Sequence, residues 1–128
     1  MDIKGQMDYW AKSSREDLAA AKTLLEKDHL RQALFFAHLS VEKAIKSCVT
    51  RRTGDVPPKT HNLVRLAEIA RLPLSGKQLE FLREFNLYQM EGRYPDTAVP
   101  AIGKGVAGAE LRRAEECLEW LTAQSQTR

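Results

Sequence analysis

The sequence predicts an all-α protein, an antiparallel up-and-down bundle of four or five helices with two long N-terminal helices. Apolar residues recur at a spacing of three and four over long stretches, and no stretch alternates with period two for long enough to demand a strand. The chain has 128 residues, of which 43% are hydrophobic and 29% charged, as in one ordinary soluble domain. We therefore expect a single helical domain over residues 1–128.

The two long helices are expected at residues 7–27 and 30–51. Their apolar or small side chains at the helical spacing are Trp10, Ser14, Leu18, Ala21, Leu24 and Leu25 in the first, and Leu34, Ala37, Val41, Ala44, Ile45 and Cys48 in the second. Asp8 is a candidate cap for the first helix, and the turn-rich TGDVPPKT segment ends the second. The short connection between the two predicts an antiparallel hairpin.

Three shorter helices follow. The third should begin near Thr60 or Asn62, the fourth should cover residues 76–90 after Ser75, and the last should cover residues 107–124. Their apolar sides are Leu63, Leu66, Ile69 and Ala70; then Leu79, Leu82, Phe85 and Leu87, with Tyr88 near the helix end; then Leu111, Ala114, Cys117, Leu118 and Leu121. The connection at 91–106 has two prolines and three glycines, and its length predicts a lid or the edge of a site.

Composition narrows the possible partners only slightly. The net charge of +3 and the pI near 9.0 permit a polyanionic partner without requiring one, because basic and acidic residues are interleaved. The apolar runs are far shorter than the roughly 20 residues that span a bilayer, and the first residues do not resemble a signal peptide, so we expect a cytoplasmic protein with no membrane contact. Cys48 and Cys117 are isolated and should lie in the core, and no metal ion or cofactor is indicated.

The segment FFAHLSVEKAIKS, residues 35–47, places polar groups among the apolar ones of the second helix. At about 100° per residue, His38 falls inside the apolar stripe and Glu42 at its shoulder, four residues before Lys46. One interpretation is a buried histidine beside an ion pair that only supports the fold. The other is a polar site at the rim of the bundle.

Asp17 favours the second interpretation. It lies at an apolar position of the first helix, where a carboxylate is costly unless a cation or water compensates it. The candidate cations are Lys43, Lys46 and Arg93.

Together, several segments resemble the HEPN domain over nearly the whole chain. These are the helix with Trp10, Asp17 and Leu24, the FFAHLSVEKAIKS segment, KTHNLVRL at 59–66 and RYPD at 93–96. The resemblance implies a helical bundle that is usually dimeric and is related to the helical domain of kanamycin-type nucleotidyltransferases. Such proteins are often encoded beside a minimal nucleotidyltransferase, as a toxin–antitoxin pair or as the substrate-binding partner of the catalytic chain.

The resemblance also bears on catalysis. HEPN ribonucleases resemble one another in an arginine and a histidine that are separated by four to six residues and lie late in the bundle. This chain has no histidine after Arg93, and the matching spacing of Arg31 and His38 falls on the second helix. We therefore expect a non-catalytic HEPN protein that partners a minimal nucleotidyltransferase. A ribonuclease toxin with a divergent site and a purely structural dimeric interaction module are the alternatives.

The expected ligand is a nucleotide or another small phosphorylated molecule, with RNA less favoured. Arg93 would contact phosphate, Lys43 or Lys46 would add charge, Tyr94 would stack on a base, and His61 would close the cleft. The surrounding polar cluster would be Asp17, His38, Glu42 and Asp96. Two alternatives stay open, in which Arg93 and Asp96 only anchor the loop and His61 only caps a helix.

A homodimer is also expected. Phe35, Phe36 and Leu39 extend apolar character beyond one core-facing arc of the second helix, and such a surface is commonly covered by another chain. Trp120 on the last helix is the alternative contact.

Overall fold

The computed structural model describes residues 2–89 and 101–125, and all regular structure in these residues is helical. The elements are α1 (Ile3–Glu26), α2 (Leu30–Thr53), α3 (Leu63–Ile69), α4 (Gly76–Phe85), the 3-10 turn η1 (Asn86–Tyr88) and α5 (Lys104–Ser125). None of the helices in the described ranges is both long and apolar enough to span a bilayer.

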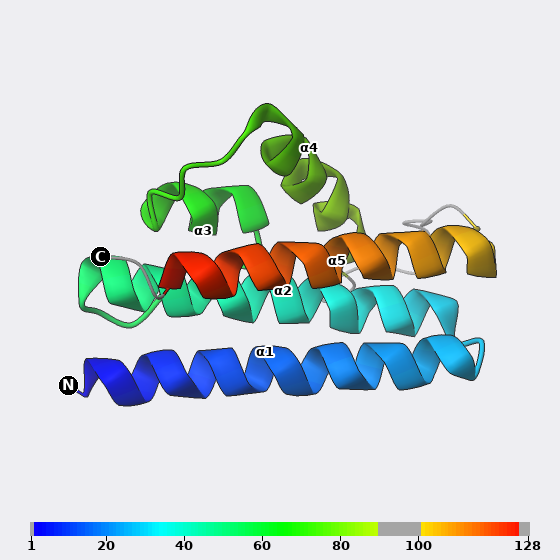
Figure 1. Cartoon of the computed structure of the whole chain (residues 1–128), viewed down its shortest axis with the longest axis horizontal. Helices are drawn as coiled ribbons and strands as arrows, with labels where there is room; N and C mark the ends of the chain where they lie inside the picture. Colours follow the sequence, from blue (N-terminus) through cyan, green and yellow to red (C-terminus); the bar gives the residue numbers. More distant parts are fainter. Residues whose placement is uncertain (1, 90–100, 126–128) are drawn as a thin grey trace.

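The bundle is built on the antiparallel hairpin of α1 and α2 (Figure 1). Helix α5 lies along this hairpin and runs in the same direction as α2, and so does α3, so the segment 54–62 and α4 carry the chain back towards the start of α5. The prediction of an up-and-down helical bundle with two long N-terminal helices is confirmed.

Helix α1 begins a turn earlier than the sequence suggested. The Asp2 side chain accepts a hydrogen bond from the Gly5 backbone N–H at 2.9 Å and caps the helix. The prediction that Asp8 caps it is wrong, because Asp8 lies inside α1 and pairs with Lys4 at 3.0 Å. The first turn is almost entirely exposed, so apolar periodicity could not reveal it.

Side-chain caps begin the two short helices where the sequence placed them. The Asn62 side chain accepts from the backbone N–H groups of Val64 and Arg65 at the start of α3. Ser75 and Gln78 form a reciprocal capping box at the start of α4. These caps fix where α3 and α4 begin.

The core is formed by the facing apolar sides of α2, α3, α4 and α5. Its largest fully buried side chains include Leu34, Ile45, Leu63, Leu66, Leu82, Phe85 and Leu121. Cys48 is buried and Cys117 partly buried, and burial raises the pKa of the Cys48 thiol to about 11 and of the Cys117 thiol to about 12. Both thiols therefore stay protonated, as expected for core residues.

Two helix boundaries differ from the prediction. Helix α4 ends at Phe85, and the tighter turn η1 places Tyr88 in the core while Leu87 stays 41% exposed, so the assignment of Leu87 to the buried side was wrong. Helix α5 begins at Lys104 rather than near residue 107. Residues 91–100 of the predicted lid lie outside the described residues.

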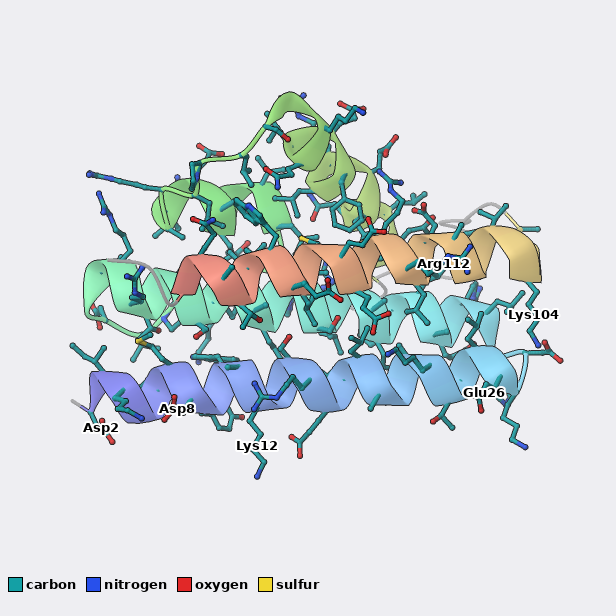
Figure 2. The ribbon with its side chains drawn as sticks, viewed as in Figure 1. Asp2, Asp8, Lys12, Glu26, Lys104 and Arg112 are labelled. Atoms are coloured by element: carbon teal, nitrogen blue, oxygen red, sulfur yellow. The ribbon has the colours of Figure 1, made fainter. Side chains whose placement is uncertain are left out.

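The exposed side of the hairpin is charged. Figure 2 shows Asp2, Asp8, Lys12 and Glu26 along the outer side of α1, directed away from α5. At the far end, Lys104 of α5 reaches Asp28 in the α1–α2 turn at 2.8 Å. Charged side chains that are buried inside the bundle are therefore exceptions to this pattern.

Candidate functional site

Glu42 is the centre of a polar cluster inside the bundle. Its side chain is 3% exposed, and it accepts a hydrogen bond from Lys46 Nζ at 2.9 Å. Lys46 is itself nearly buried, and its ammonium lies 5.2 Å from the ring centroid of Trp10 on α1. The i, i+4 pair predicted from the sequence is confirmed, but it is a buried ion pair rather than a surface one.

His61 reaches the same carboxylate from the segment that precedes α3. Its Nδ1 lies 3.0 Å and 3.2 Å from the two oxygens of Glu42. An ionised carboxylate can only accept a hydrogen bond, so Nδ1 carries the ring hydrogen and donates the bond to Glu42. This hydrogen bond fixes the orientation of the ring. The His61 side chain is 36% exposed, so the cluster reaches the protein surface through this imidazole.

His38 lies behind the cluster and is fully buried. Its Nδ1 is 3.8 Å from Glu42 Oε1, too far for a hydrogen bond, and neither ring nitrogen makes a well-formed hydrogen bond with any described residue. Burial lowers the pKa of the His38 imidazole to about 4, and the nearby Glu42 carboxylate opposes this shift only in part. His38 is therefore a neutral core residue at ordinary pH.

Asp17 takes Lys43 as its cation, one of the three candidates that the sequence offered. Lys43 Nζ lies 2.7 Å from Asp17 Oδ2 and also donates to Ser13 Oγ at 2.8 Å. Both side chains are mostly buried between α1 and α2. This pair ties the two long helices together, and its lysine is the next residue after Glu42 on α2.

Five of the predicted site residues thus fall into two charge-compensated groups: Glu42, Lys46 and His61 in one, and Asp17 and Lys43 in the other. His38 lies beside the first group without a hydrogen bond to it. Arg93, Tyr94 and Asp96 lie outside the described residues, so their part in the site stays a prediction. The sequence reasoning missed Asn86, whose side chain accepts from the Leu63 backbone N–H at 2.9 Å and donates to Asn62 at 3.2 Å.

In this arrangement a buried carboxylate orients one partly exposed imidazole. With the Nδ1 hydrogen directed at Glu42, Nε2 can accept a hydrogen bond from a ligand, and it donates one when the ring is protonated. No group of three or more histidine, cysteine, aspartate or glutamate side chains in the described ranges could hold a metal ion.

Comparison with known proteins gives the family. The HEPN domain matches residues 7–124, and no curated protein matches the sequence. An archaeal HEPN homologue, ST0689, has a similar crystal structure, with a TM-score of 0.75 and 19% identity over 94% of this chain and 98% of that one. TT1696 from Thermus thermophilus is also similar, with a TM-score of 0.77 and 23% identity over 92% and 97% of the two chains. At these identities the two structures support the fold, and the family match over most of the sequence shows that this chain belongs to the HEPN domain family.

Proposed function

We propose that this HEPN protein is non-catalytic, and that it binds a nucleotide or another small phosphorylated substrate and presents it to a separate minimal nucleotidyltransferase. In a cell the two chains would form a substrate-binding and a catalytic subunit, or the two members of a toxin–antitoxin pair. The observation that carries the proposal is the complete burial of His38 beside a solvent-accessible His61.

Burial of His38 argues against the ribonuclease alternative. The only arginine and histidine with a ribonuclease-like spacing in the sequence are Arg31 and His38. Catalysis would require the His38 ring to reach a ribose hydroxyl or a leaving oxygen, but the ring is 0% exposed. Burial also lowers the pKa of His38 to about 4, so the ring is a poor proton donor near neutral pH.

The binding role rests on His61 together with the RYPD segment. Glu42 holds the His61 ring at the surface, where it can donate to or accept from a ligand. Arg93 would hold the phosphate with its planar fork, Tyr94 would stack on the base, and Asp96 would fix the loop. Lys43 and Lys46 would add positive charge on the interior side of the site, although each already has a carboxylate partner.

Calorimetric titration with ATP and GTP tests the binding role. We expect saturable binding that Arg93→Ala weakens by about tenfold, because a charge-assisted hydrogen bond to phosphate is lost. The matched control is Arg65→Ala, which removes an exposed arginine of α3 and should leave the affinity unchanged. No binding of any nucleotide, or equal losses in the two variants, would contradict the proposal.

The ribonuclease alternative has its own assay. We expect purified protein to leave a mixed-sequence RNA intact. Cleavage that disappears in His38→Gln, with the helical circular dichroism unchanged, would establish the nuclease instead.

Mass measurement and co-elution test the proposed dimer and the proposed partner. Phe35 and Phe36 of α2 are only partly buried in the monomer, and so is Leu39, which supports a second copy covering this part of the helix. We expect light scattering to give a dimer mass at micromolar concentration, and co-elution with the nucleotidyltransferase encoded by the neighbouring reading frame. A monomer that does not co-elute with that enzyme would contradict this part of the proposal.

A further inference from the structure

Three arginines surround a recess at the end of the bundle where α2 and α3 both finish. Arg51 and Arg52 lie in the last turn of α2, and Arg71 closely follows α3. They line a recess of about 180 Å³, together with Gln124 of α5 and the side chains of Cys48, Ala70, Leu72 and Pro73. We call this feature the arginine recess.

The arginine recess gathers positive charge. In the part of the chain that the structure describes, no carboxylate forms an ion pair with any of the three arginines. Arg51 Nη1 donates to the Gln124 carbonyl oxygen at 3.3 Å, which is a neutral partner. The described lining of the recess therefore has three permanent cations and no anion.

The helix dipole explains only part of this arrangement. Basic residues in a last turn interact favourably with the C-terminal end of a helix, and this accounts for Arg51 and Arg52. Arg71 comes from another helix and has a left-handed backbone with φ of 52°, at the position after a helix where glycine is usual. The turn is closed by hydrogen bonds from the Arg71 N–H to Glu68 O at 3.0 Å and from the Leu72 N–H to Ala67 O at 3.2 Å.

We propose that the arginine recess binds the phosphate group of a small phosphorylated molecule. Guanidinium groups match the geometry of phosphate oxygens, and several around one recess can hold one or two phosphoryl groups. The volume is below the roughly 300 Å³ at which pockets for drug-sized ligands begin, so it suits a phosphate end rather than a whole nucleotide. Contacts to the sugar or base would fall outside the recess.

This site is separate from the Glu42 cluster and goes beyond the proposed function. Arg51 follows Glu42 by nine residues on α2, or about 14 Å along the helix axis. The cations of the Glu42 cluster are paired with a carboxylate, whereas those of the recess have no carboxylate partner among residues 2–89 and 101–125. The two sites can therefore be tested independently.

Calorimetric titration with pyrophosphate at low ionic strength tests the recess. We expect saturable binding that Arg71→Gln and Arg52→Gln each weaken by about tenfold, through loss of one charge-assisted contact. Arg65→Gln is the matched control, since it removes the same charge from exposed surface outside the recess. Circular dichroism of each variant verifies that the helices remain.

Further titrations with ATP, inorganic phosphate, adenosine and RNA identify the source of the phosphate. Competition between pyrophosphate and ATP would support the phosphate end of a nucleotide, and binding of inorganic phosphate and pyrophosphate without ATP would support a free phosphate site. Adenosine should not bind the recess. Binding of a short single-stranded RNA without pyrophosphate binding would overturn the proposal in favour of a nucleic-acid contact.

The remaining outcomes are also decisive. Absence of pyrophosphate binding, or equal weakening by Arg71→Gln and Arg65→Gln, would overturn the recess as a specific site. Arg71→Gln should weaken pyrophosphate binding by the same factor in the Arg93→Ala background, so the recess is measured apart from the Arg93 site and failure of the proposed nucleotide site would not be mistaken for failure of the recess.

Discussion

Two regions along α2 differ in whether their charged side chains have partners of opposite charge. Around Glu42, the charged side chains are largely buried and each has a partner: Lys46 and His61 contact Glu42, and Lys43 contacts Asp17. At the arginine recess, three cations share one hollow and have no carboxylate partner in the described residues. The difference shows how burial enforces pairing, because an isolated buried charge is very costly while an exposed one is not.

The largest effect should come from breaking the buried pair. Glu42→Gln leaves the Lys46 ammonium nearly buried without its anion, and we expect the free energy of unfolding to fall by about 3–5 kcal/mol. Urea denaturation measures this loss. The double variant Glu42→Gln with Lys46→Met removes the orphaned charge and should recover much of it; a loss below about 1 kcal/mol in the single variant would show that the pair is hydrated.

The next effect is the pH dependence caused by His38. Burial lowers the pKa of His38 from 6.5 to about 4, so between these values the unfolded chain binds the proton and the folded protein does not. Stability is therefore full above about pH 6.5 and should fall by ~3 kcal/mol as the pH drops towards 4. His38→Gln should flatten this dependence in denaturation curves taken across the interval, whereas His29→Gln, at an exposed position, should not. An unchanged pH dependence in His38→Gln would show that another group causes it.

A smaller effect is expected at the second ion pair. Lys43→Met leaves Asp17 without a cation at a side chain 15% exposed, where water can reach it in part. We expect a loss of about 1–2 kcal/mol in urea denaturation, below that of Glu42→Gln. Lys12→Met is the control, because Lys12 points away from the bundle in Figure 2 and should change stability by less than about 0.5 kcal/mol. Equal effects at the two lysines would mean that the pair contributes nothing.

The smallest expected change is an increase, not a decrease, in the free energy of unfolding. Arg71→Gly relieves a left-handed backbone at a non-glycine residue and should raise the free energy of unfolding by about 0.5–1 kcal/mol, while pyrophosphate binding is weakened. Gly54→Ala is the reverse experiment, since it places a side chain on a residue with φ of 70°. The added methyl would lie at an ordinary distance of 3.5 Å from Ile3. It should destabilise by about 1 kcal/mol, through the backbone alone. A destabilised Arg71→Gly would show that the Arg71 side chain supports the fold.

The sequence predicted most of the fold because the apolar stripes of α1, α2 and α5 are long and regular. It missed the start of α1 at Ile3, whose first turn is exposed, and misplaced Leu87, because a 3-10 turn breaks the helical spacing. Such errors arise where local pattern no longer reports on burial.

Contacts within one helix were predictable, and contacts between elements were not. Glu42 and Lys46 are four residues apart on α2, so their pairing follows from helix geometry. His61 meets Glu42 only because the chain after α2 folds back along that helix, and no sequence spacing encodes the contact. The arginine recess likewise exists only once α3 has docked, and its only sequence signal was a pair of adjacent arginines at the end of α2.

The central claim is that His61 serves ligand binding at the surface while His38 serves the core. Nuclear magnetic resonance of the histidine rings during an ATP titration at pH 7 tests it most directly. The account predicts that the His61 ring signals shift saturably, while those of the buried, neutral His38 and of the exposed His29 stay in place. A shift at His38 without one at His61, or no response from any histidine, would contradict it.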